Sequence, residues 1–295
     1  MRQPRFMSGQ SIMVASMDIA HLQQWIGRTE TRTDQVTLAP MAALTATLDR
    51  DDPPPQTGDP LPPAWHWLYF LPIHRHSELG EDGIVKRGGF LPPVPLPRRM
   101  WAGNRLEFHQ PLHAGDTVSR VSRIADVRFK EGRTGPMVFV MVRHEIHNAL
   151  GLALTEEHDI VYRAPAGGTA EPPTAPSNAE WKREIRPDEV LLFRYSALTF
   201  NGHRIHYDRR YAMEVEGYPG LVVHGPLITT LLLDLLRRHV PEGRLTRFTT
   251  RAVSPLFDTA PFLVCGGPDE GEGIRVWAQN SSGGVTMEAT AFIAL

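Results

Sequence analysis

The residues best suited to chemistry lie in two nearby stretches of the second half of the chain. The first, "FRYSALTFNGHRIHYD" from residue 193, contains His203 and His206, and the second, "EGYPGLVVHGPL", contains His224. An imidazole changes charge near neutral pH, so it can transfer protons, and its neutral form binds metal ions. These residues therefore allow a metal site, an acid–base site or a polar strand end without chemistry.

A metal site is the least favoured of the three. The first stretch has the composition of a strand, in which His203 and His206, three residues apart, point to opposite faces. No acidic residue with the spacing of a zinc ligand accompanies them. We therefore expect no metal and no cofactor other than one that is part of the substrate.

The second stretch favours the acid–base site over the polar strand end. His, Tyr and Asn do occur at strand ends where they only hydrogen-bond locally, so the first stretch alone leaves both open. His224-Gly225, however, directly precedes a predicted helix, whose free N–H groups and dipole can stabilise a developing oxyanion. Gly225 has no Cβ, so a substrate carbonyl can approach it.

The elements that must position these residues are a buried helix and an antiparallel sheet. In "HGPLITTLLLDLLRRHVPEG", Pro226 suits a first helical turn, three basic residues suit the last turn, and the helix is apolar almost all round. A sheet must therefore wrap it. Alternating strand-like runs follow in both halves: "VSRVSRIADVRFK", "PMVFVMVRHEIHN" and "LALTEEHDIVYRA" in the first, "FLVCGGP", "GIRVWAQNSSG" and "VTMEATAFIAL" in the second.

The chain divides at a Pro/Ala/Gly-rich segment. We expect a disordered tail over residues 1–17, a first domain over 18–163, a linker over 164–181 and a second domain over 182–295. The stretches around Pro111-Leu112 and Pro255-Leu256 can be superimposed, which suggests a duplication. A helix wrapped by an antiparallel sheet is the hotdog arrangement, so the fold class predicted is α+β, a double hotdog. The first half shows no equally clear helix, since "GGFLPPVPLPRRMWAG" holds four prolines, and it looks like a copy that has lost its own site.

Composition limits the possible partners. With 31 basic and 33 acidic residues among 295, the net charge of −2 gives no reason to expect nucleic acid or an anionic membrane as a partner. The longest apolar run, residues 227–236, is interrupted by Asp234 and is shorter than the roughly 20 residues that span a bilayer. The single cysteine, Cys265, excludes an internal disulfide and fits a reducing, cytoplasmic location. Exposed sheet edges make a homodimer or higher homo-oligomer plausible.

At this point the residues resemble a known family. "SALTFNGHRIHYD", followed about twenty residues later by "LVVHGPL", resembles the MaoC-like (R)-specific enoyl-thioester hydratases and dehydratases. The resemblance implies that His206 is the catalytic histidine, that Asn201 stands where the family has Asp, and that Gly225 is the oxyanion-hole glycine. His203 and Arg204 replace the Asn and Pro of the motif, so the site is a variant.

Hydration of an α,β-unsaturated thioester needs a base for water, a proton for the α-carbon and a donor for the thioester oxygen. Asn201 cannot act as a base and can only orient the water or the imidazole. Either His206 transfers both protons in turn, which a syn addition permits, or another group such as His203 or Asp208 assists. We favour the first.

A narrower resemblance points to the substrate. "GDPLPPAWHWLYF", "GGFLPPVPLPRRMWAGNRLEF" and "KEGRTGPMVFVMVRHE" resemble the mesaconyl-C4-CoA and itaconyl-CoA hydratase group, relatives of the type 2 hydroxyacyl-thioester dehydratases. This implies an acyl-CoA substrate with a second, free carboxylate, which a cation must bind. Arg204, Arg98 and Arg99 are the candidates, although Arg204 could simply pair with Asp208. The other residues expected to line the site are Tyr195, Ser196, His203 and His224.

The sequence leaves several functions open. The leading prediction is a hydratase that forms citramalyl-CoA from itaconyl-CoA or mesaconyl-C4-CoA. A 3-hydroxyacyl-thioester dehydratase of fatty-acid metabolism would need no arginine for a distal carboxylate. A thioesterase is disfavoured because residues 196–206 contain no Asp or Glu. A protein that binds acyl thioesters, or a catalytic partner, without doing chemistry is the remaining alternative.

Overall fold

A computed structural model describes residues 17–132, 135–164, 171–268 and 273–294. The tail predicted over 1–17 lies outside the described residues except for its last residue, and so does the middle of the predicted linker, 165–170. The domain boundaries therefore stay a prediction. Apart from four short 3-10 or π turns, the described helices and strands are α2 (Ile19–Gln23), β1 (Thr29–Gln35), α3 (Leu38–Thr47), β2 (Arg98–Phe108), β3 (Thr117–Gly132), β4 (Gly135–Asn148), β5 (Gly151–Arg163), β6 (Trp181–Ile185), α4 (Glu189–Leu198), α5 (Gly225–His239), β7 (Arg244–Ala252), β8 (Phe262–Pro268), β9 (Ile274–Gln279) and β10 (Val285–Ala294).

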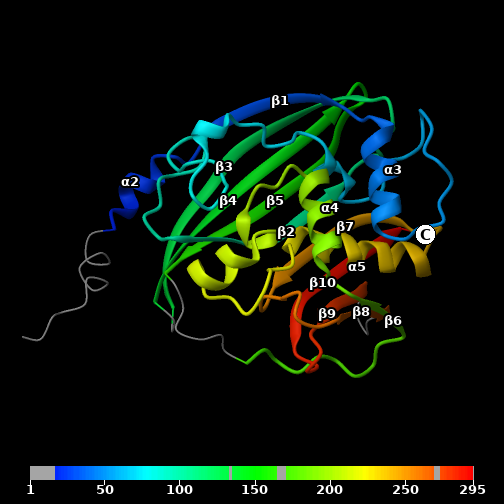
Figure 1. The fold of residues 1–295 in the computed structure, drawn as a ribbon. Coiled ribbons are helices and arrows are strands. Elements are labelled where there is room, and N and C mark those ends of the chain that lie inside the picture. The colour runs from blue at the N-terminus through cyan, green and yellow to red at the C-terminus, as the bar shows by residue number, and fades with distance from the viewer. Residues whose placement is uncertain (1–16, 133–134, 165–170, 269–272, 295) are drawn as a thin grey trace, which may run out of the picture.

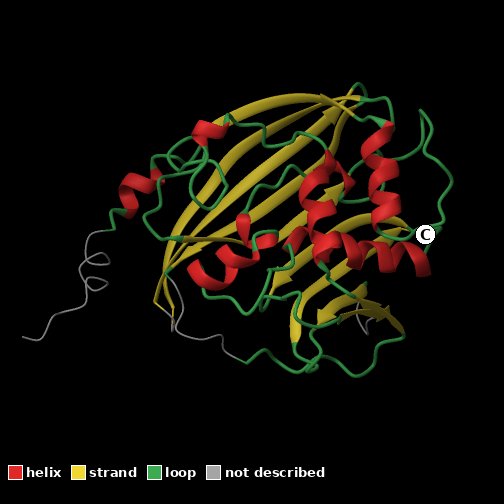
Figure 2. Ribbon diagram, viewed as in Figure 1, coloured by secondary structure: helices red, strands yellow, loops and turns green. Residues whose placement is uncertain are grey.

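The strands form one curved sheet with α3, α4 and α5 on its concave side (Figures 1 and 2). The strand order is β1-β3-β4-β5-β2-β7-β10-β9-β8-β6, and the paired strands are antiparallel. Read outward from the β2–β7 junction, the two halves have the same order of strands. The strand runs expected from alternating polarity in both halves correspond to β3, β4, β5, β8, β9 and β10.

The register at the junction supports a duplication. Leu112 and Leu256 hold equivalent positions, since the Leu112 carbonyl accepts a hydrogen bond from the Leu61 amide (2.7 Å) and the Leu256 carbonyl accepts one from the Val223 amide (2.9 Å). These two leucines differ by 144 in number, and so do Arg105 and Thr249, which lie directly opposite each other in β2 and β7. An approximate twofold axis therefore passes between the halves at this pair.

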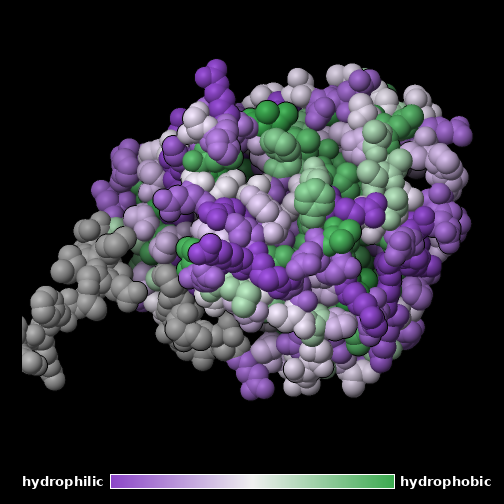
Figure 3. All heavy atoms as spheres, viewed as in Figure 1, coloured by the Kyte–Doolittle hydropathy of each residue, from purple (hydrophilic) through white to green (hydrophobic). Residues whose placement is uncertain are grey.

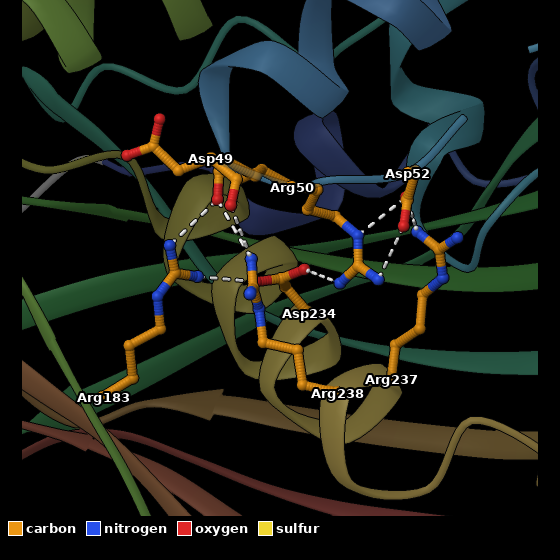
Figure 4. A network of polar contacts seen from close by, with 8 residues as sticks. Asp49, Arg50, Asp52, Arg183, Asp234, Arg237 and Arg238 are labelled. Atoms are coloured by element: carbon orange, nitrogen blue, oxygen red, sulfur yellow. Dashed lines mark hydrogen bonds and ion pairs between the residues drawn. The ribbon is translucent and has the colours of Figure 1, made fainter. Parts of the chain in front are cut away.

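Helix α5 fills the hollow of the second half, as expected from its apolar sequence. Its residues from Leu227 to Leu236 are all buried, and Pro226 lies in the first turn. At its C-terminal end the buried Asp234 carboxylate accepts hydrogen bonds from Arg50 (2.5 Å), Arg183 (2.6 Å) and Arg238 (2.8 Å) (Figure 4). Arg50 belongs to the first half, so this network fixes the loop after α3 to the C-terminal end of α5.

The first half has a 3-10 turn where the second half has its long helix. Leu61 is the counterpart of Val223, and the turn Trp65–Leu68 follows it as α5 follows Val223. The first half does contain a helix that the sequence analysis did not anticipate, α3, which packs beside α4. The segment rich in proline forms loops up to Pro97 and then enters β2, as its lack of helical pattern predicted.

Apolar side chains gather over α3 and α4 on the face shown in Figure 3, whereas the region around the end of α5 is hydrophilic. Trp65 is part of the main core, and Trp67 and Trp101 pack against it. Within the described part of the chain, no helix is both long and apolar enough to cross a membrane.

Candidate active site

The stretch from Phe193 to Asp208 is not a strand. Its first part is the C-terminal half of α4, and Arg204–His206 forms a 3-10 turn. Asp188 caps α4 by accepting a hydrogen bond from the Leu191 amide (2.8 Å). Leu192, Tyr195 and Ser196 are buried at helical spacing, whereas Phe193 is 63% exposed. The prediction of a strand was wrong because short apolar runs of this kind fit either periodicity.

His206 is the imidazole best placed to act as a base. Its Nδ1 lies 2.7 Å from the Val222 carbonyl, which can only accept a hydrogen bond, so Nδ1 carries the proton and Nε2 keeps its lone pair. The side chain is buried, and burial, followed by the neighbouring His203, lowers the pKa of His206 to about 3 even though the bond to Val222 acts in the opposite direction. The ring is therefore neutral at physiological pH.

His224 immediately precedes α5 and stacks on His206, with the ring centroids 3.7 Å apart. Its Nε2 lies 2.8 Å from the Ser196 hydroxyl of α4, and its Nδ1 is buried without a partner among the described residues. Burial first, and then the other two histidines, lower the pKa of His224 well below its usual value. The Tyr195 ring meets His224 edge-on at 5.1 Å, so Tyr195 and Ser196 hold this imidazole in place.

His203 and Asn201 form the third side of the site. The His203 ring stands perpendicular to that of His206 at 5.4 Å, and burial, followed by the charge of Arg99, lowers the pKa of His203 to about 4. Asn201 uses its Oδ1 to accept a hydrogen bond from the His203 amide (3.1 Å). The residue that replaces the expected acid therefore shapes the turn that carries the imidazoles.

The nitrogen atoms of the three histidines do not converge on one point. One nitrogen of His206 and one of His224 are already hydrogen-bonded to the protein, and these two rings lie face to face. Among the described residues, no group of three or more His, Cys, Asp or Glu has an arrangement that could hold a metal ion.

Gly225, the first residue of α5, lies against Trp101 of β2. A Cβ at position 225 would lie 2.5 Å from Cε3 of the indole, so the space expected for a substrate carbonyl is bordered by an aromatic ring from the first half. The Gly225 N–H belongs to the first turn of α5 and has no acceptor within the helix. Its role as the oxyanion donor stays a proposal.

The three candidate arginines have different surroundings. Arg204 pairs with Asp208 (2.7 Å) and lies over the Tyr211 ring at 4.2 Å, which is the alternative that the sequence left open. Arg98 pairs with Glu216 (3.3 Å). Arg99 differs from both, because no carboxylate of the described residues lies within ion-pair distance of it, and its charge acts on His203.

The first half contributes a buried polar group that the sequence analysis missed. The Glu156 carboxylate, 3% exposed, accepts hydrogen bonds from His66 (3.1 Å), Trp67 (3.2 Å) and Asn104 (3.3 Å). Burial would raise the pKa of Glu156, but the bond from His66 and the nearby imidazoles outweigh it and lower that pKa.

The register explains why this polar group can exist. Glu156 lies opposite Leu106, and Ala289 opposite Thr250, so Glu156 and Ala289 are counterparts in the duplication. In the second half the small Ala289 leaves room for α5, whereas in the first half Glu156 occupies the position where no long helix packs. The sequence did hold a signal for this buried polar group. In "VRHEIHN" and "LALTEEHD" polar residues occupy successive positions, so some of them must point to the inner face of the sheet.

Two similar halves and a long helix wrapped by one of them define a double-hotdog protein, and the neutral imidazole beside the start of that helix makes a candidate acid–base site. The solved structure of HtdX from Mycobacterium tuberculosis has a TM-score of 0.64 at 18% identity and covers 90% of this chain and all of its own. Another protein from M. tuberculosis, described as having a double hotdog fold, has a TM-score of 0.55 at 13% identity over 91% of this chain and 96% of its own.

The family model for hydroxyacyl-thioester dehydratase type 2 matches residues 64–258. Mesaconyl-C(4)-CoA hydratase from Chloroflexus aurantiacus is 46% identical over 277 residues, which are 93% of this chain and 98% of that protein. The chain belongs to the type 2 hydroxyacyl-thioester dehydratase family. It is therefore a hydro-lyase that adds water to, or removes water from, an acyl thioester.

Proposed function

We propose that this enzyme hydrates an α,β-unsaturated acyl-CoA that carries a free carboxylate, with mesaconyl-C4-CoA as substrate and citramalyl-CoA as product. Itaconyl-CoA, the other substrate named from the sequence, gives citramalyl-CoA by the same addition only after its double bond moves into conjugation with the thioester. The observation that carries the reaction type is the neutral His206, whose Nδ1 is held by Val222 and whose Nε2 has a free lone pair beside the N-terminus of α5. The similarity to a mesaconyl-C(4)-CoA hydratase supports the choice of substrate.

One imidazole suffices for the proton transfers. Nε2 of His206 takes a proton from water as the water oxygen bonds to the β-carbon, and the electrons of the double bond move to the thioester oxygen. The Gly225 N–H at the start of α5 stabilises this enolate oxygen. The imidazolium then returns the proton to the α-carbon on the same face, and the carbonyl re-forms.

Asn201 and His224 support the reaction at His206 in different ways. The Oδ1 of Asn201 is used by the His203 amide, which leaves its Nδ2 to donate a hydrogen bond to the attacking water. Protonation of His224 is disfavoured, because burial lowers its pKa well below the usual value, and its Nε2 is already hydrogen-bonded to Ser196.

A 3-hydroxyacyl-thioester dehydratase acting on unsubstituted chains is the second candidate, and the name of the matching family favours it. A panel of thioesters separates the two functions: crotonyl-CoA, mesaconyl-C4-CoA and itaconyl-CoA, each followed by the mass increase of one water. We expect mesaconyl-C4-CoA or itaconyl-CoA to have a kcat/KM far above that of crotonyl-CoA. A preference for crotonyl-CoA would support the second candidate, and release of free thiol without hydration would contradict both.

A further inference from the structure

We propose that Arg99, the Tyr162 hydroxyl and His203 form the subsite that binds the free carboxylate of the substrate. The inference rests on the proposed function and identifies the residues that select for a dicarboxylic acyl group. Two of these three groups, Arg99 and Tyr162, belong to the first half, whose own catalytic site was expected to be lost.

Strand geometry places Arg99 next to the reacting centre. Arg99 and Trp101 are two residues apart in β2, so their side chains project from the same face of the sheet, about 7 Å apart along the strand. Trp101 contacts Gly225 at the start of α5. Arg99 lies directly opposite Tyr162 in β5, and Tyr162 is fully buried, so this is the inner face.

The groups at this point have unused hydrogen-bonding capacity. The Tyr162 hydroxyl is buried and has no hydrogen-bond partner among the described residues. Burial raises the pKa of Tyr162, and the neighbouring charge of Arg99 only partly offsets the effect, so the hydroxyl keeps its proton as a donor. Although Arg99 lies close to this hydroxyl, the two do not form a hydrogen bond of good geometry. A buried donor without an acceptor, beside a guanidinium without a carboxylate, fits an anion that the substrate would bring.

Three other arginines that could bind the substrate carboxylate already have partners within the protein. Arg98 pairs with Glu216, and Arg204 pairs with Asp208. Arg87, whose guanidinium lies 5.4 Å from the Tyr162 ring centroid, donates its hydrogen bonds to the carbonyls of Val94, Leu96 and Pro97. Among these four arginines, Arg99 is the one without a carboxylate or carbonyl partner among the described residues, so it can form a bidentate pair with a carboxylate.

The position also agrees with the chemistry of the substrate. In mesaconyl-C4-CoA the free carboxylate is bonded to the β-carbon, which is the carbon that water attacks. A cation that binds this carboxylate must therefore lie close to the catalytic base. The centroid of the His203 ring is 5.4 Å from that of His206, and Arg99 is near enough to His203 for its charge to lower the pKa of that ring. Pairing the carboxylate with Arg99 also reduces its repulsion of the enolate that forms in the transition state.

The test compares two substrates that differ in the carboxylate. For each variant, the ratio of kcat/KM for mesaconyl-C4-CoA to kcat/KM for crotonyl-CoA is measured. We expect Arg99→Gln to lower this ratio about 100-fold and Tyr162→Phe about 10-fold, as the loss of a charged and of a neutral hydrogen bond would. Arg99→Lys should recover part of the loss, because it restores the charge without the bidentate geometry.

Arg251→Gln is the matched control, because this arginine is 67% exposed and pairs with Glu288. It should leave the ratio unchanged. An unchanged ratio in both Arg99→Gln and Tyr162→Phe would overturn the subsite, even if both rates fell together. If Arg99→Gln does not fold, Tyr162→Phe, which removes one buried oxygen without a partner, decides the question alone. Failure of the proposed function would look different, since the wild-type enzyme would then hydrate mesaconyl-C4-CoA no better than crotonyl-CoA, or would hydrate neither.

Discussion

The imidazole rings of His206 and His224 lie face to face, with their centroids 3.7 Å apart and their planes inclined by 18°. Their nitrogens are fixed by elements from different parts of the chain, since His206 bonds to Val222 and His224 to Ser196 in α4. Two imidazolium rings at this distance would repel each other, and both rings are buried. The pair therefore provides one uncharged base, His206, whose ring is held in place by stacking on His224.

Replacing the base should abolish hydration without unfolding the protein. We expect His206→Ala to lower kcat for hydration about 1000-fold, which is in the middle of the range for loss of a general base. His76→Ala, at an exposed position in the first half, is the matched control and should keep full activity. Far-UV circular dichroism and the midpoint of urea unfolding check the fold of both variants. A folded His206→Ala enzyme with full activity would exclude the assignment.

The hydration activity should persist at acidic pH. Because burial lowers the pKa of His206 to about 3, the free enzyme keeps this base unprotonated at every pH well above that value. kcat/KM, which reports the free enzyme, should therefore show no acid limb near pH 6.5. The measurement uses an N-acetylcysteamine thioester, which has no phosphate that titrates in this range, after a rapid pH jump. An acid limb centred between pH 6 and 7 would show that the catalytic histidine has an ordinary pKa.

Stability should depend on pH through the partly buried His144 of the first half. His144 bonds to the Ser122 hydroxyl (2.8 Å), and burial lowers its pKa to about 3, although the Glu156 carboxylate opposes this shift. The unfolded chain binds a proton at this side chain below about pH 6.5, whereas the folded protein does not, so stability is full above pH 6.5 and falls as the pH drops toward 3.

Each such histidine contributes a slope of at most about 1.4 kcal/mol per pH unit to the free energy of unfolding. His144→Asn should therefore flatten the dependence between pH 6 and 4 by up to this amount, measured by urea unfolding at a series of pH values. His76→Ala, at an exposed site, again serves as the control. An identical slope in wild type and His144→Asn would mean that His144 titrates alike in the folded and unfolded states.

The contact between Gly225 and Trp101 predicts a steric requirement. Gly225→Ala would place a methyl group 2.5 Å from the indole, so we expect it to destabilise the protein by about 1–3 kcal/mol, typical of overpacking. Trp101→Leu in the same chain should recover part of this loss by making room. Gly89→Ala, where a Cβ would meet nothing within 4 Å, is the matched control. Equal unfolding free energies for Gly225→Ala and wild type would show that the indole moves aside at no cost.

Much of the architecture could be predicted from local sequence. Helix α5 was evident because it is apolar on all sides, carries Pro226 in its first turn and ends in basic residues. The strand runs of both halves were evident from alternation, and the two Pro-Leu pairs suggested the duplication. The same kind of local signal was ambiguous over residues 193–198, where a helix was taken for a strand.

The arrangement of the site needed the tertiary structure. Arg98 and Arg99 are adjacent in sequence, yet one pairs with Glu216 and the other lies beside Tyr162 and His203, because neighbours in a strand point to opposite faces and nothing local tells which face is inside. The indole against Gly225 and the carboxylate held by His66 likewise join residues about 90 or more positions apart. Periodicity fixes the elements and the motif fixes His206, since both depend on nearby residues. The partners of each side chain depend on how distant elements pack, and that decides which charges remain free to meet a substrate.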